Sequence, residues 1–487
     1  MKKLLITTLV LSSIYATGQA DKAKTEETVA QPTIKSHIGF LASDVLRGRD
    51  TGSPELDIAA EYVKSRFIQY GVSMVSGMDS YFQNVPMKSL KVAKEGTLTL
   101  ADDSFSLNDD FLVLAGGKDL SGPIVFADYG SEADLKRAKV EGKIVVALSG
   151  DGVEQNPRAW FTISTEKRKR AKEMGAVALV ELYNSTQLPW NFLVRFLGRD
   201  QTVLDTQDGP SLTHLWMNRS QEDLGNLKKK GQTGNLSISG NEQIELLSKN
   251  VVGFVEGTDP NLKSEVVVYS AHYDHVGVGR ADAKGDTIYN GARDNAVGTV
   301  TVLSAAENIA KYPTRRSALF VLFTGEEKGL LGSQYFIDNS PVEHSKMVYC
   351  FNSDNGGYND TSIATIIGLG RTTASSIISE SSKAFGLLAT DDPAPEQGLF
   401  DRSDNVRFAS KGIPAPTFSL GFTAFDDEIG KYYHQPGDEP ETLDYDYLEK
   451  FFKAYVLSCR VIANSDEAPF WVEGDKYYEV GVQLYSK

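Results

Sequence analysis

The chain has 487 residues, of which 41% are hydrophobic and 24% are charged, a composition typical of a soluble globular protein with two or more domains. Its formal net charge of -15 at pH 7 argues against binding to nucleic acid or to an anionic membrane surface, because both require a basic face on the protein. The excess acid serves solubility or gathers carboxylates around cations.

The N-terminus has the features of an export signal. Lys2 and Lys3 precede an apolar run over residues 4–15, and small residues follow as far as Ala20. A basic segment, an apolar segment and a small-residue cleavage site in this order predict a signal peptide over residues 1–20, and hence a secreted or periplasmic protein. The run is too short to cross a bilayer, and no other stretch approaches about 18 apolar residues, so we predict no membrane span.

The segment after the signal is expected to start as a short disordered lead, because residues 21–32 are polar. Between residues 54 and 70, apolar side chains recur with a period of 3.6 residues, and Gly71 follows. This pattern predicts a helix that ends at residue 70.

Residues 108–248 differ from the rest of the chain in character. Short apolar runs at 124–127, 144–148 and 176–182 predict strands, and the basic stretch 165–174 predicts a helix. No cluster of catalytic residue types lies in this segment. We therefore expect a separate, small β-rich domain with one or two helices.

From residue 250 onward, predicted strands alternate with predicted helices. The strands span residues 266–269, 318–323, 347–351 and 417–420, and the helices span 297–312, 330–338 and 447–464. Apolar strands that alternate with helices predict an α/β sheet covered on both faces. In such sheets, functional residues gather just past the carboxyl ends of the strands.

Two segments near the first of these strands carry candidate metal ligands. His272 follows the strand and offers a nitrogen ligand, while Asp274 could hold the other imidazole nitrogen and so fix the tautomer. Asp294 stands at the head of the next helix. It either caps that helix or bridges two cations with its carboxylate.

The later strands end in further candidates. Glu326 and Glu327 follow the second strand, Asp354 follows the third, and His434 lies in a loop rich in Pro and Gly. One of the paired acids can bind a metal while the other takes a proton from a metal-bound water. Together with His272 and Asp294, they make a donor set for two zinc ions that share one carboxylate.

The ordered set of these motifs resembles the zinc aminopeptidases of family M28. The segment 37–49 is also similar to the start of bacterial secreted members, and residues 142–146 and 175–178 resemble a protease-associated (PA) domain. The resemblance implies a zinc-peptidase fold, in which helices sandwich a mixed, mostly parallel sheet. It implies a catalytic domain over 21–107 and 249–487, the latter with a C-terminal extension, and a PA insertion over 108–248.

The same resemblance implies two zinc ions per chain and peptides as the substrates. His272 and Asp354 would hold one zinc, Glu327 and His434 the other, and Asp294 would bridge them.

Catalytic roles are carried over in the same way. Glu326 would be the general base that later protonates the leaving amine, Asp274 would orient His272, and Tyr433 would donate a hydrogen bond to the developing oxyanion. The chain would thus remove the N-terminal residue of peptides. Its oligomeric state is not specified by any of these features.

Other residues are left with a structural role or an open one. Asn405 stands where the family often has His, so only a supporting role for Asp404 is expected. His275 adjoins the site, but a structural role is favoured. Among the aromatic residues, core packing is favoured over a place in a substrate pocket; these are Phe400, Phe408, Phe422 and Phe425. Two buried free thiols are expected at Cys350 and Cys459.

Three alternatives share the scaffold. A glutaminyl-cyclase-like acyltransferase works with a single zinc, and a metallo-carboxypeptidase places the same ligands around the other peptide terminus. A non-catalytic binding ectodomain would tend to lose ligands, whereas all of them are present here. Cobalt or manganese could occupy the same donor set.

Overall fold

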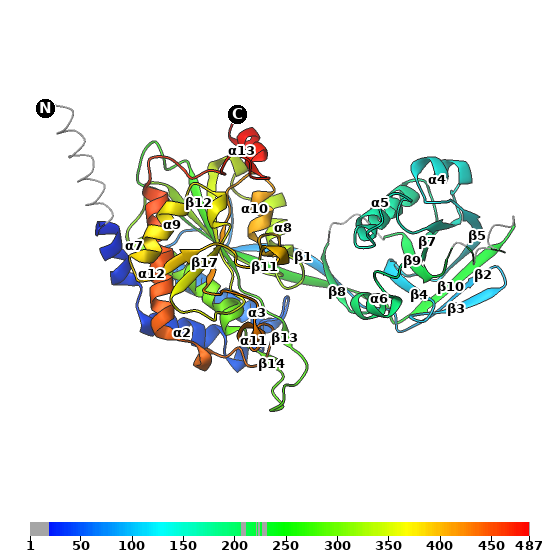
Figure 1. The fold of residues 1–487 in the computed structure, drawn as a ribbon, viewed down its shortest axis with the longest axis horizontal. Coiled ribbons are helices and arrows are strands. Elements are labelled where there is room, and N and C mark those ends of the chain that lie inside the picture. Colours follow the sequence, from blue (N-terminus) through cyan, green and yellow to red (C-terminus); the bar gives the residue numbers. More distant parts are fainter. Residues whose placement is uncertain (1–18, 206–210, 221, 223–224, 226–230, 487) are drawn as a thin grey trace. The chain divides into compact units, whose positions relative to one another are not determined.

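The computed structural model describes residues 19–205, 211–220, 222, 225 and 231–486. It forms two compact units, which are shown in Figure 1. The main unit comprises Met1–Val85 and Leu247–Lys487, and the insert unit comprises Pro86–Leu246. The predicted signal peptide lies outside the described residues, apart from positions 19 and 20. No described helix is both long enough and apolar enough to cross a bilayer.

The main unit is built on a mixed, mostly parallel sheet. Its central strands are parallel and lie in the order β19 (Thr417–Leu420), β16 (Met347–Ser353), β12 (Val266–His272) and β15 (Ser317–Phe323). On one side the sheet continues through β17 (Ile363–Ile367) and β18 (Leu388–Thr390), and on the other through β11 (Gln243–Val255) and β1 (Phe82–Leu90). A separate ribbon pairs β13 (Gly277–Val278) with β14 (Ile288–Tyr289).

Helices cover both faces of this sheet, because the strand side chains alternate between two hydrophobic clusters. Tyr269 and Phe320 face one cluster, and Val268 and Val321 face the other. The first face is covered by α2 (Gln31–Leu41), α3 (Pro54–Tyr70), α7 (Gly298–Lys311), α9 (Ser375–Lys383) and α12 (Tyr445–Asn464). The second is covered by α8 (Leu331–Asp338), α10 (Asn405–Ala409) and α13 (Tyr478–Tyr485), as Figure 1 shows. The predicted fold class is confirmed.

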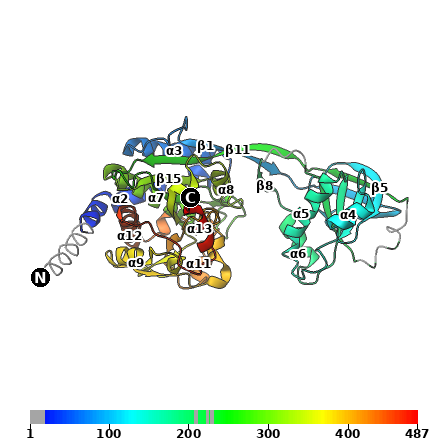
Figure 2. The same cartoon turned by 90° about the horizontal axis from the view of Figure 1, so that it is seen from above.

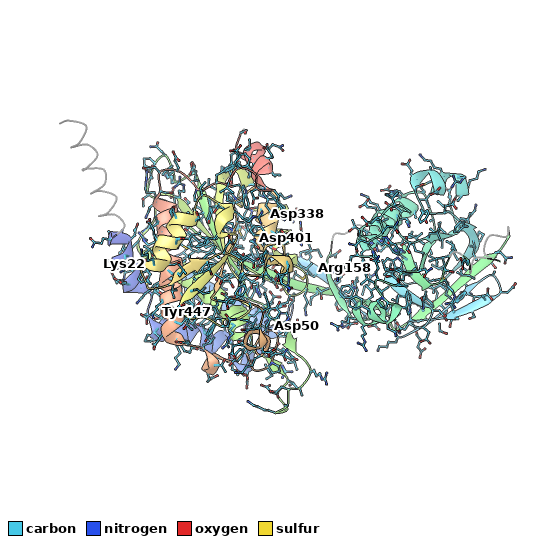
Figure 3. All side chains as sticks on the ribbon, viewed as in Figure 1. Lys22, Asp50, Arg158, Asp338, Asp401 and Tyr447 are labelled. Atoms are coloured by element: carbon cyan, nitrogen blue, oxygen red, sulfur yellow. The ribbon has the colours of Figure 1, made fainter. Side chains whose placement is uncertain are left out.

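The last helices are tied to the sheet by tyrosine hydroxyls. Tyr447 of α12, labelled in Figure 3, donates to the carbonyl of Ile363 in β17 at 2.9 Å. Tyr485 of α13 donates to the carbonyl of Met347 in β16 at 2.6 Å, and Figure 2 shows this C-terminal helix within the main unit. The C-terminal extension therefore belongs to the fold of the main unit.

Local patterns located most elements well. The helix predicted over residues 54–70 is α3, where the Ser53 side chain accepts the N–H of Leu56 and Gly71 ends the helix with a φ of 82°. Cys350 and Cys459 are buried and free, as predicted.

The expected disordered lead is wrong, because residues 19–28 are helical. The Asp21 carboxylate there lies 2.7 Å from the guanidinium of Arg460 in α12, and both side chains are buried. A buried partner more than 400 residues away is invisible to a local pattern.

The insert unit has an eight-stranded sheet of its own. Its strands, in spatial order, are β3 (Asp103–Ser106), β2 (Glu95–Leu100), β10 (Thr233–Ser239), β5 (Leu120–Phe126), β6 (Ile144–Leu148), β7 (Ala178–Tyr183), β9 (Thr213–Asn218) and β4 (Phe111–Ala115). Its helices are α4 (Glu132–Ala138), α5 (Trp160–Glu173) and α6 (Trp190–Leu197). A further strand, β8 (Gln201–Leu204), pairs with the end of β1.

The unit boundaries differ from those expected from the sequence. The insert unit begins at Pro86 and ends at Leu246, instead of spanning 108–248. The difference arises because β2 pairs with β10 of the insert sheet and β3 pairs with β2, so neither strand joins the main sheet. Residues 86–107, which the family resemblance places in the catalytic domain, therefore fold with the insert.

Candidate metal centre

Three neighbouring parallel strands deliver the candidate ligands to one edge of the main sheet. His272 is the last residue of β12, Glu326 and Glu327 follow β15, and Asp354 follows β16. Because parallel strands end at the same edge, these side chains meet there. His434 comes from a loop after α11 (Asp427–Gly430), far along the chain.

Two groups of possible metal ligands share the carboxylate of Asp294. In the first, the His272 Nε2 atom lies 3.3 Å from one oxygen of Asp294 and 3.3 Å from one oxygen of Asp354. In the second, the His434 Nε2 atom lies 3.1 Å from the other oxygen of Asp294 and 3.2 Å from Glu327. All ligand atoms within each group lie within 4.8 Å of one another.

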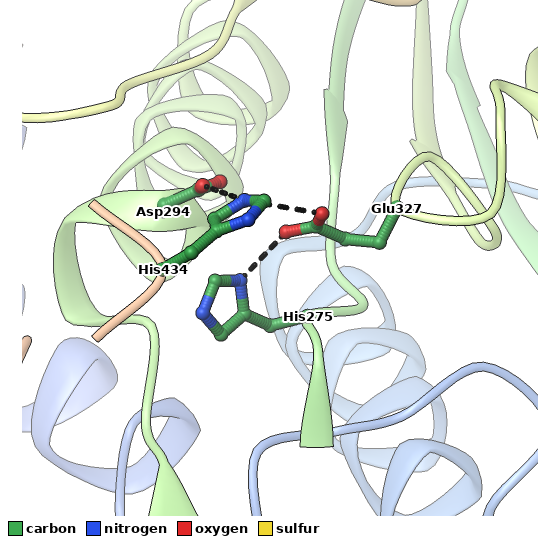
Figure 4. A group of neighbouring side chains, drawn as sticks. All are labelled: His275, Asp294, Glu327 and His434. Carbon is green, nitrogen blue, oxygen red and sulfur yellow. Dashed lines mark hydrogen bonds and ion pairs between the residues drawn. The ribbon is translucent and has the colours of Figure 1, made fainter. Parts of the chain in front are cut away.

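His275 belongs to the second group. Its Nδ1 atom lies 2.8 Å from the other oxygen of Glu327, as Figure 4 shows. The sequence favoured only a structural role for this histidine. The contact between His275 and Glu327 spans 52 positions, so no local pattern could predict it. The only sequence feature that pointed to a role for His275 in the site was its position close to His272.

The backbone around Asp294 is shaped for this position. The turn Ala292–Val297 follows Gly291, whose φ of 58° favours glycine, and its backbone is not helical at Asp294 and Asn295. A Cβ atom on Gly291 would overlap the carbonyl of Asp294 and come within 2.6 Å of the His275 ring. The helix α7 is capped by Asn295, which accepts the N–H of Gly298 at 3.0 Å. The capping interpretation therefore applies to Asn295 and not to Asp294.

Asp438 fixes the same turn from the other side. Its carboxylate accepts the N–H groups of Arg293 at 2.9 Å and Asp294 at 3.2 Å, and it pairs with the Arg293 guanidinium at 2.9 Å. All three side chains are buried. No sequence pattern indicated this role for Asp438.

A second buried cation joins the loops that carry the ligands. The Arg49 guanidinium donates to the carbonyls of Tyr273 at 2.9 Å, Asn290 at 2.7 Å and Gly291 at 3.0 Å. Burial lowers the pKa of Arg49 to about 10, although nearby carboxylates such as Asp274 and Asp294 oppose the shift. Arg49 therefore holds the loop after His272 against the loop before Asp294.

Asp274 contacts His272 mainly through its backbone. The His272 Nδ1 atom lies 3.1 Å from the carbonyl oxygen of Asp274 but 3.9 Å from its carboxylate. The carboxylate accepts the hydroxyl of Thr51 at 2.8 Å and the N–H of Glu326 at 3.2 Å. Its side chain therefore orients Glu326 more directly than it orients the imidazole.

The charged groups of the cluster shift one another's pKa values strongly. Burial would raise the pKa of Asp294, but hydrogen bonds to His272 and His434 lower it far below its ordinary value. Burial likewise opposes the shift at Glu327, where hydrogen bonds to His275 and His434 lower the pKa to about 2. The carboxylates of Asp294 and Glu327 in turn raise the pKa of His434 to about 10, against the effect of burial.

Glu326 is shifted in the opposite direction. Burial raises its pKa well above the ordinary value, and the carboxylates of Asp354 and Asp404 add to the rise, while His272 opposes it. Asp404 is fully buried, and burial raises its pKa to about 7. A glutamate with a raised pKa beside a cluster of ligands suits a group that accepts and returns a proton near neutral pH.

A small cavity of about 90 Å³ adjoins the cluster and contains Glu326 and Tyr433 in its wall. The Tyr433 ring stacks on the His434 ring with centroids 4.2 Å apart. Phe422 and Phe425 also line this cavity, whereas Phe400 and Phe408 are buried in a core cluster. The four aromatic residues thus divide between pocket and core.

The remaining histidines pack as structural residues. His37 contacts the hydroxyls of Tyr62 at 2.7 Å and Tyr70 at 3.0 Å. His344 contacts the carbonyl of Ile337 at 2.9 Å.

The donor chemistry fits divalent metal ions. Imidazole nitrogens and carboxylate oxygens are the ligands that zinc takes in proteins without cysteine. The two groups contain three carboxylates and three histidines, and the carboxyl groups of Glu326 and Asp404 lie close to Asp354 as well. Five carboxyl groups thus lie near three histidines, so added positive charge would balance them. A covered α/β sheet with this centre at its carboxyl edge indicates a metal-dependent enzyme.

The comparisons narrow this class to one family. Residues 250–458 match the model of peptidase family M28, and these residues contain every candidate ligand. Residues 250–458 therefore form a peptidase M28 domain, as the sequence motifs predicted.

Known relatives share long stretches with the chain. It is 27% identical over 369 residues to aminopeptidase YwaD of Bacillus subtilis, covering 73% of this chain and 70% of the relative. It is 30% identical over 139 residues to a probable leucine aminopeptidase 2 of Aspergillus oryzae, covering 28% of this chain but only 25% of that relative. The solved aminopeptidase from Aneurinibacillus sp. strain AM-1 aligns with a TM-score of 0.56 and 20% identity, covering 92% and 97% of the two chains, and shows the same fold. The predicted enzyme class, a hydrolase of the zinc aminopeptidase family, is confirmed.

Proposed function

We propose that this M28 peptidase is an aminopeptidase that uses two zinc ions held on either side of Asp294. The observation that carries the proposal is the position of Asp294, whose two oxygens face different histidines at 3.3 and 3.1 Å. A carboxylate in this position belongs to both ligand groups. Two metal ions that share one ligand form a clamp on an attacking and a leaving group.

The ligands divide between the two positions. His272 and Asp354 would hold one ion, and Glu327 and His434 the other, with Asp294 common to both. His275, at 2.8 Å from Glu327, orients that carboxylate. When bound, the zinc ions would lower the pKa of a water molecule and polarise the scissile carbonyl.

Glu326 supplies the proton transfers. Its raised pKa and its place in the cavity wall support a role as the base that deprotonates the attacking water and then protonates the leaving amine. Asp274 positions Glu326 by accepting its backbone N–H. Tyr433 lines the same cavity and is proposed to donate to the oxyanion.

Cleavage from the N-terminal end is supported by the relatives, which are named aminopeptidases. The cavity, at about 90 Å³, suits one side chain and not an extended chain on both sides of the bond. We also propose that residues 1–20 direct export of the protein and that the insert unit is a PA domain.

The test is hydrolysis of a panel of aminoacyl-p-nitroanilides by the full chain, before and after chelation and after addition of zinc. We expect chelation to abolish release of p-nitroaniline and zinc to restore it. Glu326→Gln should retain two zinc ions per chain and lose at least about 10²-fold in kcat. The matched control is Glu343→Gln at an exposed glutamate, which should remain fully active.

Other outcomes would favour the alternatives. Release of C-terminal residues from N-blocked peptides would replace the proposal with a carboxypeptidase. Cyclisation of N-terminal glutamine with one zinc per chain would replace it with a glutaminyl-cyclase-like enzyme. Two bound zinc ions without any turnover would leave a binding ectodomain.

A further inference from the structure

The insert unit contains a large cavity that has no part in the metal centre. Its volume is about 600 Å³, within the range of ligand pockets. All its lining residues fall between Lys88 and Gln243, inside the insert unit. None of them lies in the region 250–458 that matches the M28 family.

Two edge strands contribute to the wall of this cavity. β4 is the last strand of the insert sheet and pairs only with β9, while β8 ends its own sheet and pairs only with β1. Figure 2 shows β8 beside β1. Both strands line the cavity, β4 through residues 112–115 and β8 through Gln201, Val203 and Leu204.

The free sides of these strands retain unused hydrogen-bonding groups. Within the described part of the chain, residues 112–115 and 201–204 form no backbone hydrogen bond outside their ladders. Proteins usually cover or block such edges, because an unpaired edge recruits another extended chain. Here two edges border one cavity.

The cavity is also positively charged. Lys118, Arg168 and Arg199 line it, and none of the three has an ion-pair or hydrogen-bond partner for its side chain among the described residues. Lys88 and Lys91 line it as well, but they pair at 2.7 Å with Asp205 and Asp200. Glu242 also lines the cavity, so three cations without an ion pair face one further acid. This excess of cations, on a chain with a net charge of -15, points to an anionic ligand.

We propose that this cavity binds an extended, carboxylate-rich peptide segment by strand addition between β4 and β8. The backbone of the segment would pair with a strand edge, and its acidic side chains would meet Lys118, Arg168 and Arg199. Four extended residues span about 13 Å, which matches the length of β8. The proposal does not rest on the aminopeptidase activity, because the bound segment needs no free N-terminus.

The test uses full-length Glu326→Gln protein and a fluorescent, N-acetylated peptide of alternating Glu and Val, read by fluorescence anisotropy. We expect saturable binding whose affinity falls as the salt concentration rises. The affinity should also fall at least tenfold when Lys118, Arg168 and Arg199 are all changed to Gln. The control changes Lys139, Arg158 and Lys169, which are exposed cations of the same unit outside the cavity, to Gln; Arg158 is labelled in Figure 3. It alters net charge equally and should bind like the parent.

A peptide N-methylated at alternate residues separates strand addition from simple charge attraction. It keeps every carboxylate but loses the backbone donors, so we expect binding to fall at least tenfold. Equal binding of the methylated peptide, or of a Gln-for-Glu peptide, would overturn the proposal. So would concentration-dependent dimerisation that the triple variant abolishes, because the edges would then pair with a second copy of the chain.

Discussion

Each unit contains a buried cluster of ionisable side chains, and the two clusters are built differently. In the insert unit, Glu181 accepts hydrogen bonds from Ser164 at 2.5 Å, His214 at 2.7 Å and Trp216 at 2.9 Å. It also pairs with the buried ammonium of Lys167. Each charge in this cluster has its partner within the protein, so the cluster is closed.

The cluster of the main unit is open, because its carboxyl groups lack enough cationic partners within the protein. His272 and His434 each lie near two carboxylates at 3.1 to 3.3 Å, and Asp294 is common to both. With Glu326 and Asp404 included, five carboxyl groups lie close to three histidines. The comparison teaches that burial of charged residues alone does not mark a functional site. An unbalanced donor set at the carboxyl edge of parallel strands does.

The strongest test of this contrast is Asp294→Asn. The change removes the carboxylate that both groups share, so we expect zinc content to fall from two ions to less than one per chain. Aminopeptidase activity should drop by at least about 10³-fold, because metal activation of the nucleophile is lost. The measurements are zinc by atomic emission and kcat/KM on the preferred p-nitroanilide.

The control for this change is Asp282→Asn, which removes an acid from the exposed loop between β13 and β14. It should leave zinc content and activity unchanged. Two zinc ions in Asp294→Asn with near-normal activity would contradict the bridging role.

Local pattern sufficed for the strands and for most ligands. The run 318–323 is apolar throughout and all of β15 is buried, so the end of the strand is predictable and Glu326 and Glu327 follow it. The motif around His272 was recognised in the same way. These elements owe their structure to neighbours in sequence and to burial, which a pattern of apolar residues records.

Long-range partners could not be predicted. Asp438 binds the turn of Asp294 across 144 positions, and Asp21 pairs with Arg460 across 439. His275 owes its place to Glu327, which comes from another strand. Such contacts depend on the order of the strands in the sheet, and no local sequence pattern predicts that order.

A substitution in the closed cluster should lower the unfolding free energy of the insert unit and leave the zinc content of the protein unchanged. Lys167→Met leaves Glu181 buried without its ammonium partner, so we expect a loss of about 3–5 kcal/mol in the unfolding free energy of the insert unit. Denaturant unfolding followed by tryptophan fluorescence measures it, because three of the four tryptophans lie in this unit. Lys169→Met, at an exposed site on the same helix, is the control. Zinc content should not change in either variant, and a loss of zinc in Lys167→Met would break the distinction between the two clusters.

A smaller effect, on zinc affinity, is expected when Asp438, which holds the turn of Asp294, is changed. Asp438→Asn removes the charge that pairs with Arg293 and weakens the grip on the turn of Asp294, so zinc affinity should fall by about 10- to 100-fold. Competition with a fluorescent chelator gives the two dissociation constants. Glu441→Gln, at an exposed acid nearby, should bind zinc like the parent. An unchanged affinity in Asp438→Asn would show that Arg49 alone holds the turn.

The smallest effect concerns pH and follows from the charges of the closed cluster. Burial opposes ionisation of Glu181, but His214 and Lys167 outweigh it and lower the pKa from 4.5 to about 2. Burial lowers the pKa of His214 below 6.5, although Glu181 opposes that shift. Both folded-state values lie below the unfolded ones, so the unfolded insert unit binds more protons and its stability decreases as the pH falls.

The expected course has two stages. Between pH 7 and 5 only His214 contributes, because its stabilisation is present above 6.5 and is lost below that value. Glu181 contributes a further loss as the pH falls from 4.5 towards 2. Tryptophan fluorescence melts at pH 7, 5.5 and 4 should show a falling midpoint that zinc does not restore. His214→Gln should flatten the first stage, since Gln can still donate to Glu181 but does not titrate, and a parent-like slope in that variant would place the acid sensitivity in the main unit.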